Sequence, residues 1–187
     1  MGYLDEICAA NGELLLWVAV IMTNRLEPPD IHHLNAAEGW LGLSNTTEAK
    51  DELAKLSLTV LGHPDVLRVK YHLYEKSKEW AKAADTAQLL CQVVPEAPFG
   101  WIHLAYALHE LRRTREAYDV LIPIADQFPD EYVIRYNLAC YCCQMGQLDE
   151  ARAWLKKAIG LIGADTIKEM AASDPDLERM KEEIRQF

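Results

Sequence analysis

The sequence contains none of the short motifs that commonly mark an enzyme active site. It has no G-x-x-x-x-G-K-[ST] loop for nucleotide phosphates and no G-x-G-x-x-G turn for dinucleotides. It also has no G-x-S-x-G nucleophile elbow and no H-E-x-x-H zinc pair. The sequence therefore favours a protein that is not an enzyme and that uses no cofactor.

Basic residues are scarce compared with acidic ones. The chain has 19 Lys and Arg residues against 29 Asp and Glu residues, which gives a formal net charge of -10. An acidic surface repels nucleic-acid phosphates and the anionic face of a membrane. We therefore expect neither a nucleic acid nor a membrane as the binding partner.

A long apolar stretch is also missing, because the apolar run at residues 14–22 has only nine members. A helix that spans a bilayer needs about 20. Asp5, Glu6 and Glu13 precede the run, where a signal peptide would carry basic residues. Three interpretations of residues 1–29 stay open. They form an extra helix, they self-associate through residues 14–22, or they are a non-native extension with the true start at Met22.

The cysteines do not form the pattern of a secreted disulfide protein. They are odd in number and three of them fall within four residues: Cys8, Cys91, Cys140, Cys142 and Cys143. A reducing, cytoplasmic location is therefore expected. Cys140 and Cys143 share one helix face, but no second pair stands at zinc-site spacing, so packing is favoured over metal binding. A nucleophilic Cys143 with His109 as its base lacks any oxyanion donor in the sequence.

What the sequence does have is a period of 34 residues. Alanine recurs at this spacing with no insertion, at Ala49, Ala83, Ala117 and Ala151. Apolar residues stand four positions after each alanine, at Leu53, Ala87, Leu121 and Leu155. Small or aromatic residues stand twelve positions before, at Ala37, Tyr71, Ala105 and Ala139. Prolines near the joins divide the chain into frames 30–63, 64–97, 98–131 and 132–165.

Each frame predicts two helices. In the third frame, apolar residues at positions i, i+3, i+4 and i+7 indicate a first helix: Trp101, Leu104, Ala105 and Leu108. Ala117, Leu121 and Ile124 indicate a second helix. Thr114 is expected to cap this second helix with its side chain.

With these residues the chain resembles the tetratricopeptide repeat family. Its signature is a 34-residue helix–turn–helix with W-x2-L-G-x2-Y, then A-x3-F, then P. The third frame reads Trp101-x2-Leu104-Ala105-x2-Leu108, then Ala117-x3-Leu121. The first two frames are more degenerate, with His33 and Lys70 at signature positions. The resemblance implies an all-α fold, a right-handed superhelical α-solenoid of four helix–turn–helix repeats.

Such a stack needs caps at its ends. Asp174-Pro175 is typical of a helix start, and Leu177, Met180 and Ile184 follow at helical spacing. The sequence therefore predicts a capping helix over 175–186, within a C-terminal region of 166–187.

The resemblance also implies a concave groove that is lined by the first helix of each repeat. Carried onto this chain, it contains Leu34, Glu38, Leu41, Arg68, His72, Lys76, Phe99, Ile102, Tyr106, His109, Val133, Tyr136, Cys140 and Gln144. Tyr106 and Tyr136 are the expected anchors for a peptide or partner protein, and neither should matter for stability. Alternatively, the N-terminal segment or the C-terminal helix folds back and fills this groove. The predicted function is a non-enzymatic protein-interaction module, and the alternative is an assembly protein that self-associates through residues 14–22.

Overall fold

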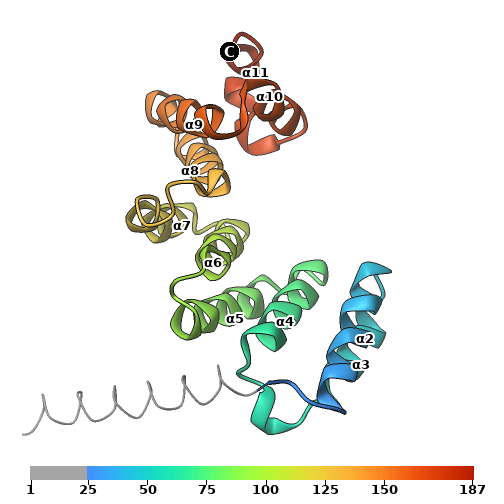
Figure 1. Ribbon diagram of the computed structural model, residues 1–187. Helices are drawn as coiled ribbons and strands as arrows, with labels where there is room; N and C mark the ends of the chain where they lie inside the picture. Colours follow the sequence, from blue (N-terminus) through green and yellow to red (C-terminus); the bar gives the residue numbers. More distant parts are fainter. Residues whose placement is uncertain (1–24) are drawn as a thin grey trace, which may run out of the picture. The chain divides into compact units, whose positions relative to one another are not determined.

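The computed structural model describes residues 25–187, so the predictions for residues 14–22 lie outside the described part of the chain (Figure 1). From residue 25 to residue 187 all regular structure is helical and no strand is present. The all-α class predicted from the sequence is therefore confirmed. The chain divides into two compact units, one ending at Pro95 and the other beginning at Glu96.

Between residues 25 and 95, the first unit contains two helix pairs. The elements are α2 (Asp30–Gly42), α3 (Thr46–Leu53), the 3-10 turn η1 (Leu58–Val60), α4 (Pro64–Lys76) and α5 (Trp80–Val93). Helix α2 packs against α3, α4 packs against α5, and α2 and α3 both contact α4. The core of the first two helices includes Leu34, Leu41 and Leu53. Asp30 joins the start of α2 to the loop after α3, because its carboxylate accepts hydrogen bonds from the backbone N–H and the hydroxyl of Ser57.

The second unit repeats this pairing and adds a C-terminal extension. Its elements are α6 (Pro98–Glu110), α7 (Thr114–Leu121), the 3-10 turn η2 (Ile122–Ile124), α8 (Tyr132–Gln144), α9 (Leu148–Ile162), α10 (Ala164–Ala172), the 3-10 helix η3 (Pro175–Met180) and α11 (Lys181–Ile184). Helix α6 packs against α7, and α8 packs against α7 and α9. The 3-10 helix η3 lies against α8, and α10 contacts α9 and α11.

The 34-residue period has a local structural counterpart in the turns inside the helix pairs. Residues with positive φ recur at this spacing, at Ser44, Lys78, Arg112 and Gly146. In each turn the N–H of the following residue donates to the carbonyl five positions back, as Arg113 does to Leu108. This is the hydrogen bond of a Schellman helix end. All twelve residues that define the sequence period are buried, and the four alanines at 49, 83, 117 and 151 are each 0% exposed.

Two local predictions differ from the structure. The predicted helix over 175–186 is a 3-10 helix followed by a single short α-turn, and a separate helix, α10, precedes it. At the start of this segment the carboxylates of Asp174 and Asp176 contact Tyr136 on α8 and His109 on α6. Thr114 does not cap α7 either: Arg113 is the N-cap residue, no side chain caps the helix, and the Thr114 hydroxyl faces His109 instead.

The turns give a first testable prediction. Arg112 has φ 64, a left-handed conformation that costs a side-chain-bearing residue about 1–2 kcal/mol. Arg112→Gly removes that strain but adds chain entropy, so we expect a gain of up to about 1 kcal/mol in the free energy of unfolding. Gly146→Ala, at φ 78, should lose about 1 kcal/mol. Urea denaturation followed by circular dichroism measures both, and an unchanged Gly146→Ala would contradict this account of the turn.

Candidate functional site

The groove residues predicted for the first unit do not all face solvent. Leu34 and Leu41 are buried in the core at 3% and 5% exposure, so their assignment to a binding groove is wrong. They face inward because α2 packs against both α3 and α4. Glu38, Arg68 and Lys76 are exposed. Arg68 lies 3.6 Å from Asp65, and half-buried His72 lies 3.1 Å from Glu75.

The groove residues predicted for the second unit fall into two groups. Tyr106 and Gln144 are exposed, while Phe99 and Val133 are half-buried. The others are buried: Ile102, His109, Tyr136 and Cys140. For these four, the prediction of an open surface is wrong. The assignment of Tyr136 as an anchor without a role in stability is also wrong, because its side chain is only 6% exposed.

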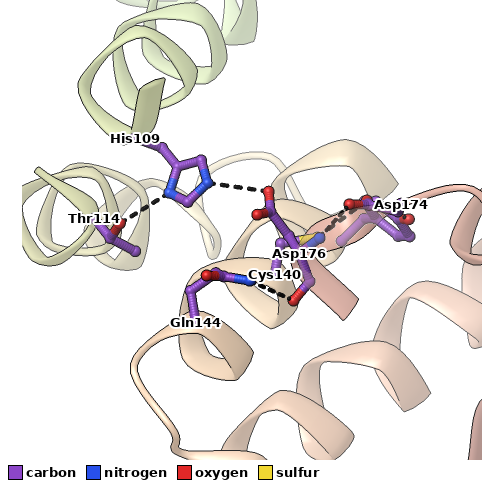
Figure 2. A network of polar contacts seen from close by, with 7 residues as sticks. His109, Thr114, Cys140, Gln144, Asp174 and Asp176 are labelled. Atoms are coloured by element: carbon purple, nitrogen blue, oxygen red, sulfur yellow. Dashed lines mark hydrogen bonds and ion pairs between the residues drawn. The ribbon is translucent and has the colours of Figure 1, made fainter. Parts of the chain in front are cut away.

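The C-terminal segment covers three of these buried residues. We call residues 174–180 the tail segment, and His109, Tyr136, Cys140 and Gln144 the tail site. Helix α6 supplies His109 and helix α8 supplies the other three. Figure 2 shows the side chains of Asp174 and Asp176 close to His109, Cys140 and Gln144. A C-terminal element of the chain therefore contacts all four residues of the tail site.

Asp174 is the first contact between the tail segment and its site. Its Oδ2 accepts a hydrogen bond from the Tyr136 hydroxyl at 2.8 Å and faces the Cys140 thiol at 3.6 Å. Its Oδ1 accepts from the backbone N–H of Asp176 at 2.9 Å and so caps the start of η3. One carboxylate thus fixes both the position and the local conformation of the tail segment.

Asp176 is the second contact. Its Oδ2 lies 3.0 Å from His109 Nε2, and its backbone carbonyl accepts from the Gln144 amide at 3.0 Å. This geometry allows an Nε2–H of His109 to donate to the Asp176 carboxylate. His109 Nδ1 lies 2.9 Å from the Thr114 hydroxyl, which can donate to it when the imidazole is neutral (Figure 2). The Tyr141 ring lies against the same imidazole, with centroids 5.0 Å apart.

The chemistry of the tail site is that of a set of hydrogen-bond donors. Burial raises the pKa of the Tyr136 phenol, and Cys140 and Asp174 raise it further. Burial, followed by the charge of Asp174, raises the pKa of the Cys140 thiol well above its usual value. Both groups therefore keep their protons at neutral pH. Phenol, thiol, imidazole and amide all present N–H, O–H or S–H groups, so the site recognises carboxylates and carbonyl oxygens.

The hypothetical pair of Cys143 and His109 is not formed. Both ring nitrogens of His109 face other groups, Thr114 and Asp176. Cys143 is 0% exposed, and burial raises the pKa of its thiol. A reactive cysteine needs an exposed, readily ionised thiol, and Cys143 has neither property.

The family resemblance predicts His109, Tyr136, Cys140 and Gln144 as groove residues, but the sequence does not predict that Asp174 and Asp176 contact them. The sequence indicates only a helix start at Asp174 and no role for Asp176. The available signal was the pair of carboxylates two residues apart, directly ahead of an apolar residue, Leu177. Their partners come from positions 32–67 residues earlier in the chain, and no local pattern connects them.

Across residues 25–187, no group of three or more His, Cys, Asp and Glu side chains is placed to hold a metal ion. In the same part of the chain, no helix combines the length and apolar character needed to cross a membrane. In comparisons with known proteins, no family model matches the chain and no curated protein matches it.

Proposed function

We propose that this chain is a helical-repeat protein of the tetratricopeptide type that binds another protein and catalyses no reaction. The observation that carries the proposal is the tail site. Four of the positions that the family resemblance assigns to a peptide-binding groove hold a peptide segment, residues 174–180 of the same chain. A face that already binds one segment of protein has the shape and the donors to bind such segments in general.

The repeat architecture of the proposal has local support. The helix pairs α2–α3, α4–α5, α6–α7 and α8–α9 each fall within one of the 34-residue frames. Their internal turns share the same backbone conformation and the same hydrogen bond. We propose that these four pairs are the repeats of an α-solenoid, and that α10, η3 and α11 together form its C-terminal cap. A cytoplasmic location accords with the buried thiols of Cys91, Cys140, Cys142 and Cys143, all of which are free.

The residues proposed for partner binding are first-helix residues that stay exposed within each unit taken by itself. These include Arg68 and Lys76 on α4 and Tyr106 on α6. Tyrosine and arginine are enriched among the residues that dominate protein interfaces. Replacing Arg68 and Lys76 by glutamate, or Tyr106 by alanine, should lower partner capture at least about tenfold, which corresponds to about 1.4 kcal/mol. None of these changes removes a core side chain, so the melting temperature should stay close to that of the wild type.

The measurement is affinity capture from a lysate of the source organism with quantitative mass spectrometry. Lys50→Glu with Lys157→Glu is the matched control, because it reverses two exposed charges on the second helices α3 and α9. The control should recover the same partner at the wild-type yield. If the Arg68, Lys76 and Tyr106 variants also recover it at that yield, the first helices do not form the interface and the proposal fails.

A further inference from the structure

We infer that the tail segment is an exchangeable ligand, and that the tail site binds an acidic segment of another protein in its place. The expected ligand has two carboxylates two residues apart, followed by an aliphatic side chain. This inference rests on the proposed function and specifies the chemistry of its partner.

The recognised groups all belong to a short peptide motif. Asp174 accepts from Tyr136, Asp176 accepts from His109, and Leu177 is buried at 0% exposure. The Gln144 amide donates a hydrogen bond to a backbone carbonyl, a group that any peptide carries. The order carboxylate, any residue, carboxylate, aliphatic residue therefore supplies each of these groups.

The tail segment has little structure that it could keep without the site. The 3-10 helix η3 has six residues and α11 has four. Helices this short are not stable in water by themselves, because too few hydrogen bonds offset the entropy lost in ordering the chain. Release of the tail segment therefore breaks its contacts with the tail site and exposes the buried side chains of Leu177 and Met180, but it disrupts no independent fold. The side chains of Asp176 and Gln144 reach solvent at the edge of the site, where a competing segment can begin to bind.

A competing peptide must displace a tail segment that is covalently attached to the same chain as its site. A segment attached to its own site acts at an effective concentration in the millimolar range, so a free peptide of the same sequence binds the intact protein only weakly. Weakening the tail segment while leaving the tail site intact should therefore strengthen binding of the free peptide. Stronger peptide binding after this change distinguishes an exchangeable ligand from a permanent cap. If the tail segment is a permanent cap, its loss leaves no site that can bind the peptide.

The test uses the full chain and a synthetic peptide with the sequence of residues 172–187, labelled with fluorescein. Fluorescence anisotropy should show that Asp174→Ala/Asp176→Ala binds this peptide at least tenfold more tightly than the wild type. A peptide that carries the same two alanines should bind neither protein. Glu178→Ala/Glu182→Ala is the matched control, because it removes two carboxylates of the C-terminal segment that are exposed. It should bind the peptide no better than the wild type.

A chemical readout checks that the peptide enters the same site. Cys140 is 4% exposed beneath Asp174, so loss of the tail segment should expose its thiol. Iodoacetamide should alkylate Cys140 faster in the double alanine variant than in the wild type, as measured by mass spectrometry. Added peptide should slow this reaction again, and alkylation that the peptide does not slow would count against the inference.

If the double alanine variant does not fold, the inference is tested with the wild-type protein. Excess peptide should then accelerate hydrogen exchange in the tail segment of ¹⁵N-labelled protein, whose fragments differ in mass from the peptide. If exchange there is unchanged, or if a folded variant does not bind the peptide, the tail segment is a permanent cap and the inference is overturned. In that case, capture of a partner that depends on Arg68, Lys76 and Tyr106 would still support the proposed function. The two failures are therefore distinguishable.

Discussion

Replacing Leu121 by alanine is expected to lower the free energy of unfolding by about 2–5 kcal/mol. Leu121 ends α7 and is 0% exposed, in the position that follows Ala117 by four residues. Removing most of this side chain takes apolar atoms out of the core and leaves a cavity that its neighbours fill only in part. Urea denaturation monitored by circular dichroism measures the loss.

The matched control for this variant is Leu161→Ala. Leu161 belongs to the same unit and is 39% exposed on α9, so its replacement should cost far less than that of Leu121.

The buried core also predicts a loss of stability from a larger side chain at Ala151, because the added atoms do not fit there. Ala151→Leu should destabilise the protein by about 1–3 kcal/mol. A wild-type melting temperature for Ala151→Leu would show that the assigned contact between α8 and α9 is wrong.

Replacing Arg135 by methionine should cost about 3 kcal/mol or more. Arg135 is 7% exposed and donates to three backbone carbonyls in the segment that joins α7 to α8. Its guanidinium lies 2.5 Å from the carbonyl of Phe128, 2.9 Å from that of Glu131 and 2.5 Å from that of Ala125. A hydrogen bond to a charged group contributes about 1.5–3 kcal/mol, and a buried carbonyl left without a donor costs about 1–3 kcal/mol.

Two further variants make the Arg135 prediction specific. Arg135→Lys keeps the charge but lacks the planar guanidinium that donates to several carbonyls at once. It should therefore lose less stability than Arg135→Met but remain less stable than the wild type. Arg113→Met is the matched control, because Arg113 is exposed and pairs with Glu116 beside it on the helix surface. Such a surface pair contributes about 0–1 kcal/mol. Thermal denaturation should therefore separate Arg135→Met clearly from Arg113→Met, and equal losses would contradict the assigned role.

The sequence by itself determined the helical class and the positions of the close helix contacts. Burial of small residues such as Ala83 and Ala151 follows from their spacing, because a fixed period returns the same position to the same helix contact. Helix starts at prolines also follow from local chemistry, as Pro64 and Pro98 begin α4 and α6. Each of these features depends on residues close together in the chain.

Only the tertiary structure decided what the predicted groove contains. Tyr136 and Cys140 lie on helix α8, but both contact Asp174, which is more than 30 residues away in the chain. Arg135 stands where the repeat signature has tryptophan, and its carbonyl partners follow from the path of the loop before α8. Periodicity reports which side of a helix faces its neighbour in the repeat. It carries no information about a later segment that packs on the other side, because those contacts join residues that no repeat relates.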